Sequence, residues 1–86
     1  MRLAFEDAGW EDYLYWQQYD RAVLRKINEL LRDCLRTPRA GLGKPEALKG
    51  NYRGAWSRRI TGEHRLVYRV ESETVVVAQC RYHYEP

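Results

Sequence analysis

The sequence predicts an α+β fold, a small twisted antiparallel sheet with two N-terminal helices packed on one face. Two observations carry this prediction. Apolar residues recur at helical spacing in the first half of the chain, and polar and apolar residues alternate after residue 54. A chain of 86 residues has room for one hydrophobic core. We therefore expect a single domain over residues 1–86.

The N-terminal part predicts a short strand followed by a helix. Residues 2–5 alternate between polar and apolar, as a strand does. Asp7 is a suitable N-cap for a helix that runs to about Gln18. The aromatic side chains of this segment do not fit on one stripe; they are Trp10, Tyr13, Tyr15, Trp16 and Tyr19. They either rim the core or form a protein–protein contact, and the pattern leaves both open.

The second helix is the clearest element of the sequence. Asp20 can cap it, and its apolar residues follow a single stripe at helical period: Val23, Leu24, Ile27, Leu30, Leu31, Cys34 and Leu35. Pro38 disfavours helical geometry at the residue before it, so the helix should end near Arg36. Cys34 lies on the stripe, which predicts a small buried side chain.

A connector rich in glycine and proline, residues 37–54, leads into the β part of the chain. Three strands are expected, at residues 55–61, 65–70 and 74–80, joined by short polar turns. This spacing predicts an antiparallel meander. One face of the sheet should take the helices, while the arginines of the middle strands project from the other.

Positive charge is concentrated in the second half of the chain. The net charge is +3, and 12 of the 15 basic residues are arginine. Residues 39–69 hold eight Lys or Arg against only two Glu. Such a block attracts polyanions, and arginine grips phosphate with a planar fork. Charge alone leaves phosphate binding and a merely solvated surface about equally supported.

The composition argues against several classes of protein. No apolar run approaches the roughly 20 residues that span a bilayer, and the N-terminus turns acidic before a signal-peptide core could form. The two cysteines, Cys34 and Cys80, are too few for a disulfide framework and lack the spacing of zinc ligands. We therefore expect a reduced cytoplasmic protein that needs no membrane, metal or cofactor.

Several separate motifs give the sequence a specific resemblance. They lie, in order, at residues 12–16, 26–30, 43–49, 56–61, 63–68 and 80–84. Together they closely resemble the YoeB-type toxins of the RelE/ParE superfamily, over essentially the whole chain. Two departures are visible. Ala47 stands where relatives often have a second proline, and Glu85 and Pro86 extend beyond the tyrosine at which many relatives end.

The resemblance implies the toxin of a bacterial type II toxin–antitoxin pair. Members of the family enter the ribosomal A site and cut the mRNA there without a metal ion. The implied partners are the ribosome, mRNA and an antitoxin with an acidic segment, and the chain is expected to have a tendency to dimerise. The implied fold is the small sheet with two helices described above.

The resemblance also assigns site residues. Glu46 would be the general base, His83 the general acid, Arg65 the phosphate clamp and Tyr84 a supporting contact. Further basic residues expected to contact RNA are Lys44, Lys49, Arg58 and Arg59.

The chemistry of these residue types agrees with that assignment. Cleavage by the neighbouring 2′-hydroxyl needs a base, an acid for the leaving 5′-oxygen and positive charge on the phosphate. Glu46 is the one carboxylate between residues 39 and 62, although a surface ion pair would also explain it. Of the two histidines, His64 lies in a turn and is expected to be structural or solvent-facing. Tyr82 is expected in the core.

Strand alternation adds one condition to the C-terminal assignments. It would place His83 and Tyr84 on opposite faces, unless the last strand ends before them or one of the two is structural.

Two other functions compete with the nuclease. ParE-like relatives block DNA gyrase without cutting RNA, and a plain RNA-binding module would show salt-dependent affinity but no product. The set of Glu46, Arg65 and His83, together with the ending Arg-Tyr-His-Tyr, favours the nuclease.

Overall fold

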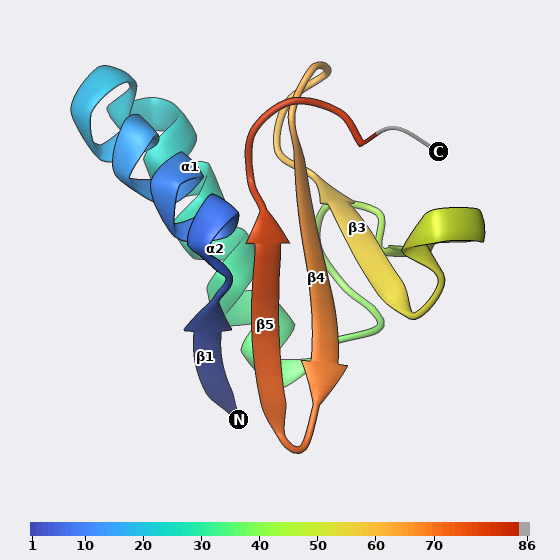
Figure 1. Cartoon of the computed structure of the whole chain (residues 1–86). Helices are drawn as coiled ribbons and strands as arrows, with labels where there is room; N and C mark the ends of the chain where they lie inside the picture. The colour runs from blue at the N-terminus through green and yellow to red at the C-terminus, as the bar shows by residue number, and fades with distance from the viewer. Residues whose placement is uncertain (85–86) are drawn as a thin grey trace.

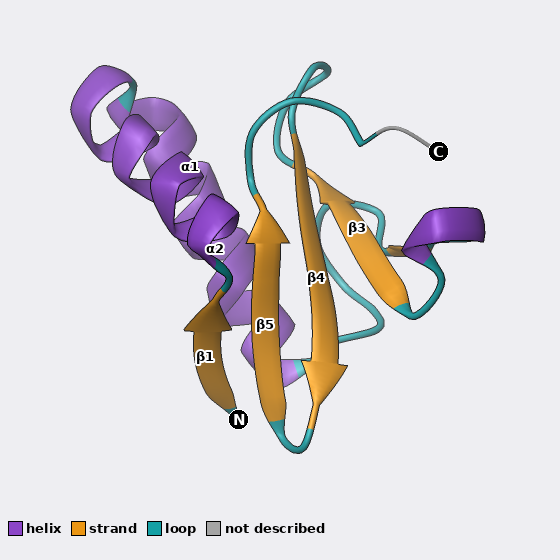
Figure 2. Cartoon of the chain, viewed as in Figure 1, coloured by secondary structure: helices purple, strands orange, loops and turns teal. Residues whose placement is uncertain are grey.

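In the part of the chain that the structure describes, five strands form one mixed sheet, in the order β1–β5–β4–β3–β2, and two helices pack against it (Figures 1 and 2). The structure is a computed structural model that describes residues 1–84. The elements are β1 (Arg2–Phe5), α1 (Asp7–Tyr19), α2 (Arg21–Arg36), β2 (Glu46–Ala47), the short 3-10 helix η1 (Gly50–Tyr52), β3 (Ala55–Arg59), β4 (Arg65–Glu71) and β5 (Thr74–Gln79). The C-terminal extension of Glu85 and Pro86 lies outside the described residues. The predicted fold class is confirmed.

The predicted meander is present, because β3, β4 and β5 pair antiparallel in chain order. The first strand differs from the expectation of a purely antiparallel sheet. β1 pairs with β5 in parallel, with Leu3 opposite Val75 and Phe5 opposite Val77. A parallel pair needs a long connection, and the two helices with the rest of the chain supply it. β2 is a two-residue strand within the predicted connector, and it adds an edge next to β3.

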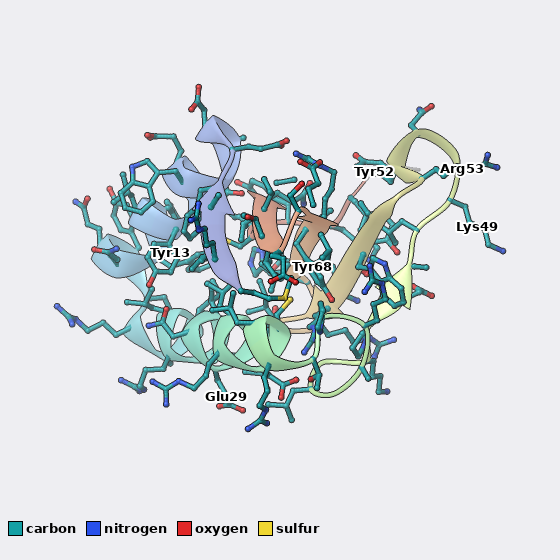
Figure 3. The ribbon with its side chains drawn as sticks, turned by 90° about the horizontal axis from the view of Figure 1, so that it is seen from below. Tyr13, Glu29, Lys49, Tyr52, Arg53 and Tyr68 are labelled. Carbon is teal, nitrogen blue, oxygen red and sulfur yellow. The ribbon has the colours of Figure 1, made fainter. Side chains whose placement is uncertain are left out.

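The second helix forms as predicted. The Asp20 carboxylate accepts hydrogen bonds from the backbone N–H of Ala22 and Val23, at 3.1 and 3.2 Å. Its apolar stripe faces the sheet, and Ile27, Leu30 and Cys34 are fully buried. Figure 3 shows Tyr68 of β4 between the sheet and α2, with Glu29 pointing away from the helix into solvent. The helix ends at Arg36.

The first helix departs from the prediction at its start. Glu6 occupies the N-cap position, its side chain makes no cap hydrogen bond, and Asp7 is already helical. Only Gly9 and Trp16 are buried along this helix. The exposed apolar side chains on it include Trp10 and Leu14.

Strand alternation sorts the arginines of the sheet onto two faces. Trp56 and Arg58 of β3 are in phase, and their cross-strand partners Tyr68 and Leu66 also belong to the face that carries the helices. Arg59 and its partner Arg65 lie on the open face. The sheet therefore presents to solvent only part of the arginine block.

Arg58 corrects the prediction that it contacts RNA. Its side chain has 0% exposure and donates to Asp33 at 2.7 Å, forming a buried ion pair. The same guanidinium donates to the carbonyl oxygens of Thr37, Ala40 and Leu42. An arginine on the apolar phase of a strand can stay charged there only with such partners. Arg58 therefore anchors the start of the connector.

Both cysteines are free and buried. Burial raises the pKa of the Cys80 thiol to about 12 and raises that of Cys34 as well. Residues 1–84 hold no group of three His, Cys, Asp or Glu side chains that could bind a metal ion. Neither of the described helices is long and apolar enough to cross a membrane.

Candidate active site

The connector delivers Glu46 to the edge of the sheet. Glu46 pairs with Ser57 of β3, and the Leu48 N–H donates to the Ala55 carbonyl at 2.9 Å. Upstream, the Arg59 N–H donates to the Gly43 carbonyl at 2.7 Å. These backbone bonds fix an exposed carboxylate beside the open face.

Gly43 is the tight point of this path. Its φ is +79°, and an added Cβ would lie 2.9 Å from Leu30 Cδ2 and 3.1 Å from Arg58 Cβ. A side chain there would be strained by its backbone and would also push against the buried arginine. The connector can approach β3 because this position is glycine.

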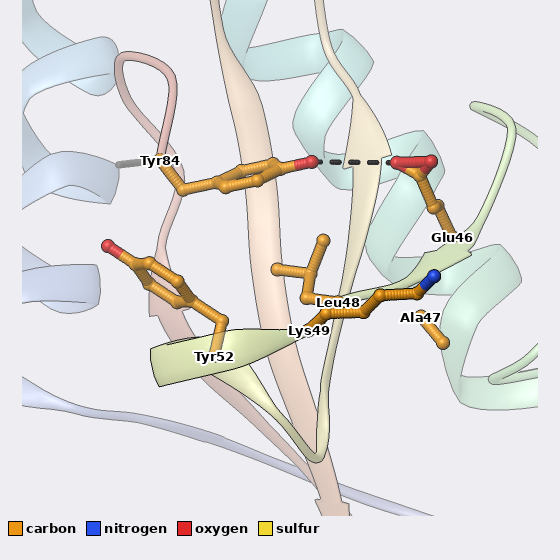
Figure 4. Close-up of a pocket in the computed structure, with 6 residues that line it drawn as sticks. All are labelled: Glu46, Ala47, Leu48, Lys49, Tyr52 and Tyr84. Carbon is orange, nitrogen blue, oxygen red and sulfur yellow. Dashed lines mark hydrogen bonds between the residues drawn. The ribbon is translucent and has the colours of Figure 1, made fainter. Parts of the chain in front are cut away.

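Tyr84 reaches Glu46 from the other end of the chain. Its hydroxyl lies 3.5 Å from Glu46 Oε1, at the outer limit of a hydrogen bond (Figure 4). The Tyr84 ring lies 5.6 Å from the Tyr52 ring and 4.8 Å from the His83 imidazole, centroid to centroid. A carboxylate, a phenol and an imidazole therefore follow one another across this surface.

A shallow pocket of about 320 Å³ lies at this point. Its lining residues are Glu46, Ala47, Leu48, Lys49, Tyr52 and Tyr84 (Figure 4). Leu48 packs with Ala55 and Val67 in a small apolar cluster, to which Tyr52 and Tyr84 add their rings. The pocket thus combines an apolar base, two aromatic rings, one carboxylate and one ammonium group.

His83 is exposed, next to this pocket but not part of its lining. Its Nδ1 lies 3.2 Å from the Tyr84 carbonyl oxygen. β5 ends at Gln79, so strand alternation does not govern His83 and Tyr84. Of the readings left open by the sequence, the one in which the strand ends early is confirmed.

Arg65 begins β4 and lies opposite Arg59 on the open face. Its Nη1 donates to the carbonyl oxygens of Thr61, Gly62 and His64, at 2.7, 3.3 and 3.1 Å. All three bonds use one nitrogen, so Nε and Nη2 have no hydrogen-bond partner within residues 1–84. The guanidinium is therefore held in place with donors left over for an anion.

The structure brings some predicted site residues together and separates others. Glu46, Lys49 and Tyr84 share the pocket. Lys44 and Arg59 are exposed outside its lining, on the path that leads to β2 and on β3. Arg58 points into the core instead.

Three features of the site were not predicted. Tyr52 lines the pocket, and its signal was a lone aromatic residue within a polar connector. Asp33 forms the ion pair with Arg58. The sequence feature that could have indicated this is an acidic residue in phase with Leu30 and Cys34 on α2. Tyr82 was placed in the core but is 54% exposed, because the chain turns at this residue with φ +65°.

Comparisons with known proteins agree with one another. A family model described as a YoeB-like toxin of bacterial type II toxin–antitoxin systems matches residues 5–84. The toxin YoeB of Escherichia coli K12 is 56% identical over 84 residues, which are 98% of this chain and 100% of that relative. The toxin YoeB of Streptomyces coelicolor is 51% identical with the same coverage.

Solved structures give the same picture. A YoeB/ParE toxin from Agrobacterium tumefaciens matches with a TM-score of 0.95 at 53% identity, covering 98% of this chain and 100% of that one. A heterotetrameric YoeB–YefM toxin–antitoxin complex from Staphylococcus aureus matches with a TM-score of 0.90 at 47% identity, covering 98% of each chain. A YoeB dimer from the same organism matches equally well.

Proposed function

The chain belongs to the YoeB-like toxins of bacterial type II toxin–antitoxin systems, and from that premise we propose that it is an endoribonuclease that cuts mRNA in the ribosomal A site and stops translation. The whole of residues 1–86 would form this one toxin domain. The observation that carries the proposal is the contact of Tyr84 with Glu46 beside His83, at the rim of a pocket that also holds Lys49.

The proposed reaction uses the 2′-hydroxyl of the RNA as nucleophile. The 2′-oxygen forms a bond to phosphorus while its proton passes to Glu46, the general base. The bond from phosphorus to the 5′-oxygen breaks, and His83 donates a proton to that leaving oxygen. The products are a 2′,3′-cyclic phosphate and a free 5′-hydroxyl, so atoms and protons balance. Each proton-transfer group contributes roughly 10²–10⁴ in rate.

Arg65 is the proposed clamp on the reacting phosphate. Its Nε and Nη2 can address two phosphate oxygens, while Nη1 keeps the side chain tied to the turn before β4. Negative charge grows on those oxygens in the transition state, and a fixed cation stabilises it there. Tyr84 would support Glu46 through its hydroxyl.

The open face supplies the proposed RNA contacts. Lys44, Lys49 and Arg59 are exposed cations around the pocket and along β3, and we assign them to RNA phosphates. The rings of Tyr52 and Tyr84 offer surfaces on which a base can stack, and such stacking contributes about 1–3 kcal/mol per base. Arg58 has no part in RNA binding in this proposal, because it is buried.

The shallowness of the pocket supports a dependence on the ribosome. The pocket is open and Glu46 is exposed, so little in the chain alone can fix a flexible mRNA strand. Positioning of reacting groups contributes as much to rate as proton transfer does. We therefore propose that the ribosome positions the mRNA strand for cleavage. We also propose that the chain works in the cytoplasm.

Two protein partners follow from the relatives. The Staphylococcus aureus protein is found in a YoeB–YefM complex and as a YoeB dimer. We propose that this chain also pairs with an antitoxin, whose acidic segment covers the basic open face, and that it forms a homodimer.

The test is to map the 5′ ends of messages in a translating lysate for wild type, Glu46→Gln and His83→Ala. We expect new 5′-hydroxyl ends within A-site codons for wild type, and a loss of about 10²-fold or more for each variant. Glu29→Gln is the matched control, because Glu29 is an exposed carboxylate on α2, away from the site. Intact messages together with lost gyrase supercoiling would instead identify a ParE-like gyrase inhibitor, and binding without product an RNA-binding module.

A further inference from the structure

The segment that carries His83 and Tyr84 is not a strand, yet its backbone is held by side chains. The Cys80 N–H donates to Asp12 Oδ2 at 3.0 Å, and the Cys80 carbonyl accepts from Trp16 Nε1 at 2.8 Å. Both partners come from α1. The end of β5 is thus tied to the first helix before the chain turns toward the pocket.

The turn itself is held by His64. The Tyr82 N–H donates to His64 Nδ1 at 2.7 Å, and the Tyr82 carbonyl accepts from the Arg65 N–H at 3.0 Å. Tyr82 has a φ of +65°, a left-handed conformation that is costly for a residue with a side chain. Such a residue stays in place only where its surroundings fix it. The two bonds to residues 64 and 65 do this directly before His83 and Tyr84.

His64 is itself held rigidly. Its side chain is only 13% exposed, and its ring meets the edge of the Trp16 indole at a centroid distance of 4.8 Å. Because Nδ1 accepts a hydrogen bond, the proton of the neutral ring lies on Nε2. Nε2 lies 3.6 Å from Glu63 Oε1, and that carboxylate favours a proton at this position.

We propose that His64 is a positioning residue of the nuclease: its unprotonated Nδ1 fixes the left-handed turn at Tyr82 and so presents His83 and Tyr84 to Glu46. This inference rests on the proposed function. His64 touches no reacting atom in this arrangement, and it acts through the backbone of Tyr82, the residue directly before His83 and Tyr84.

The arrangement has a consequence for pH. A second proton on the ring turns Nδ1 into a donor that faces another donor, so the bond to Tyr82 is lost. The charged groups beside the ring are Glu63 on its own turn and Asp12 on α1. Arg65 on β4 donates to the His64 carbonyl, and Arg81 lies over the Tyr82 ring, which neighbours the imidazole. Protonation of Nδ1 should therefore release the turn at Tyr82 and lower activity.

Replacing His64 by asparagine or by glutamine, both neutral amides, tests the roles of its two ring nitrogens separately. In His64→Asn the side-chain oxygen lies near the place of Nδ1, whereas in His64→Gln it lies near the place of Nε2. We expect His64→Asn to keep kcat within about threefold, because its side-chain oxygen can still accept the Tyr82 N–H. We expect His64→Gln to lower kcat by about 10- to 100-fold with little change in KM, as a small misplacement of catalytic groups does. Equal effects of the two variants, or no effect of either, would overturn the proposal.

A second measurement does not depend on activity or on mutation. A through-hydrogen-bond ¹⁵N–¹⁵N coupling between the Tyr82 amide and His64 Nδ1 is expected in the wild-type protein at about pH 8, and it should vanish when the ring is protonated. Absence of this coupling at about pH 8, with a proton found on Nδ1, refutes the contact. A wild-type chain that shows the coupling but cuts no message refutes the proposed function instead.

Discussion

Arg58 and Arg59 are neighbours in sequence with opposite environments. Arg58 is fully buried against Asp33, and Arg59 is exposed on the open face. Charge patterning alone could not separate them. The signal that does so is phase, since Arg58 lies in phase with Trp56 and Ile60, which both contact the core. A basic residue on the apolar phase of a strand predicts an internal anchor.

This contrast gives a paired prediction. Arg58→Ala leaves the Asp33 carboxylate without its buried partner, with only the exposed Arg36 beside it, and should lower the free energy of unfolding by about 3–5 kcal/mol. Arg59→Ala should change it by less than about 0.5 kcal/mol. Instead, Arg59→Ala should make the plot of log affinity for RNA against log salt concentration shallower by a slope of about 0.7. That is the contribution of one phosphate contact on a single strand. Urea denaturation and salt titrations of RNA affinity measure the two effects, and the reverse pattern would contradict the placement of these side chains.

Asp33 adds a pH dependence. The Leu42 N–H and the Arg58 guanidinium donate to its carboxylate and hold its pKa below the usual range. Stability from this group is therefore present above the ordinary Asp pKa of about 3.9 and is lost as pH falls through the lower folded value. We expect Tm to decline below about pH 4 in wild type. Asp33→Asn should lower Tm at neutral pH and flatten that decline; an unchanged acid profile would refute the assignment.

At the scale of elements, the sequence predicted what is local. α2 follows from one uninterrupted stripe and a capping Asp20, and the meander of β3, β4 and β5 follows from alternation between short turns. Neither β1 beside β5 nor β2 beside β3 could be derived this way. The first pairing joins segments about 70 residues apart, and its partner is fixed by packing in three dimensions. β2 has only 2 residues, too few for alternation to mark it.

The site shows the same limit. Resemblance named Glu46, His83 and Tyr84, but their meeting depends on the turn at Tyr82, which no local pattern signals. Alternation was the wrong guide there because β5 ends at Gln79. Tyr52 was missed because its role comes from contact with Tyr84, a residue 32 positions away in the chain.

The connector offers a test at the scale of elements. Gly43→Ala should destabilise the fold by at least about 1–2 kcal/mol, the cost of a left-handed residue with a side chain, and it should also displace Glu46. Gly62→Ala is the control, since nothing lies within 4 Å of an added Cβ at that position and no positive φ is involved. Denaturation and message cleavage should both separate the two variants; a silent Gly43→Ala would contradict the close approach to Leu30 and Arg58.

Within residues 1–84, the larger core joins the helices to the sheet and encloses three titratable side chains, those of Tyr68, Cys34 and Cys80. Burial raises the pKa of Tyr68 and of Cys80 to about 12 and raises that of Cys34. The phenol and the two thiols are neutral when protonated, and burial favours that neutral form. Their contribution to the free energy of unfolding is therefore complete below the ordinary pKa values of about 8.5 for Cys and 10 for Tyr. It is lost as pH rises further through the folded values.

Two measurements check this prediction. The free energy of unfolding should fall progressively above about pH 9. Thiol alkylation at about pH 8 should occur only as fast as global unfolding, because neither buried thiol forms a thiolate in the folded state. Rapid labelling of either cysteine in the native protein would show that the core is not closed.

We propose that this chain uses the 2′-hydroxyl of an mRNA in the ribosomal A site as its nucleophile, with Glu46 and His83 moving the protons. The most direct measurement is single-turnover cleavage on ribosomes programmed with a message that carries one 2′-deoxynucleotide at the scissile position. We expect the all-ribose message to be cut to a cyclic phosphate end, while the deoxy message stays whole yet still competes for the toxin. Cleavage of the deoxy message at the same bond would contradict it.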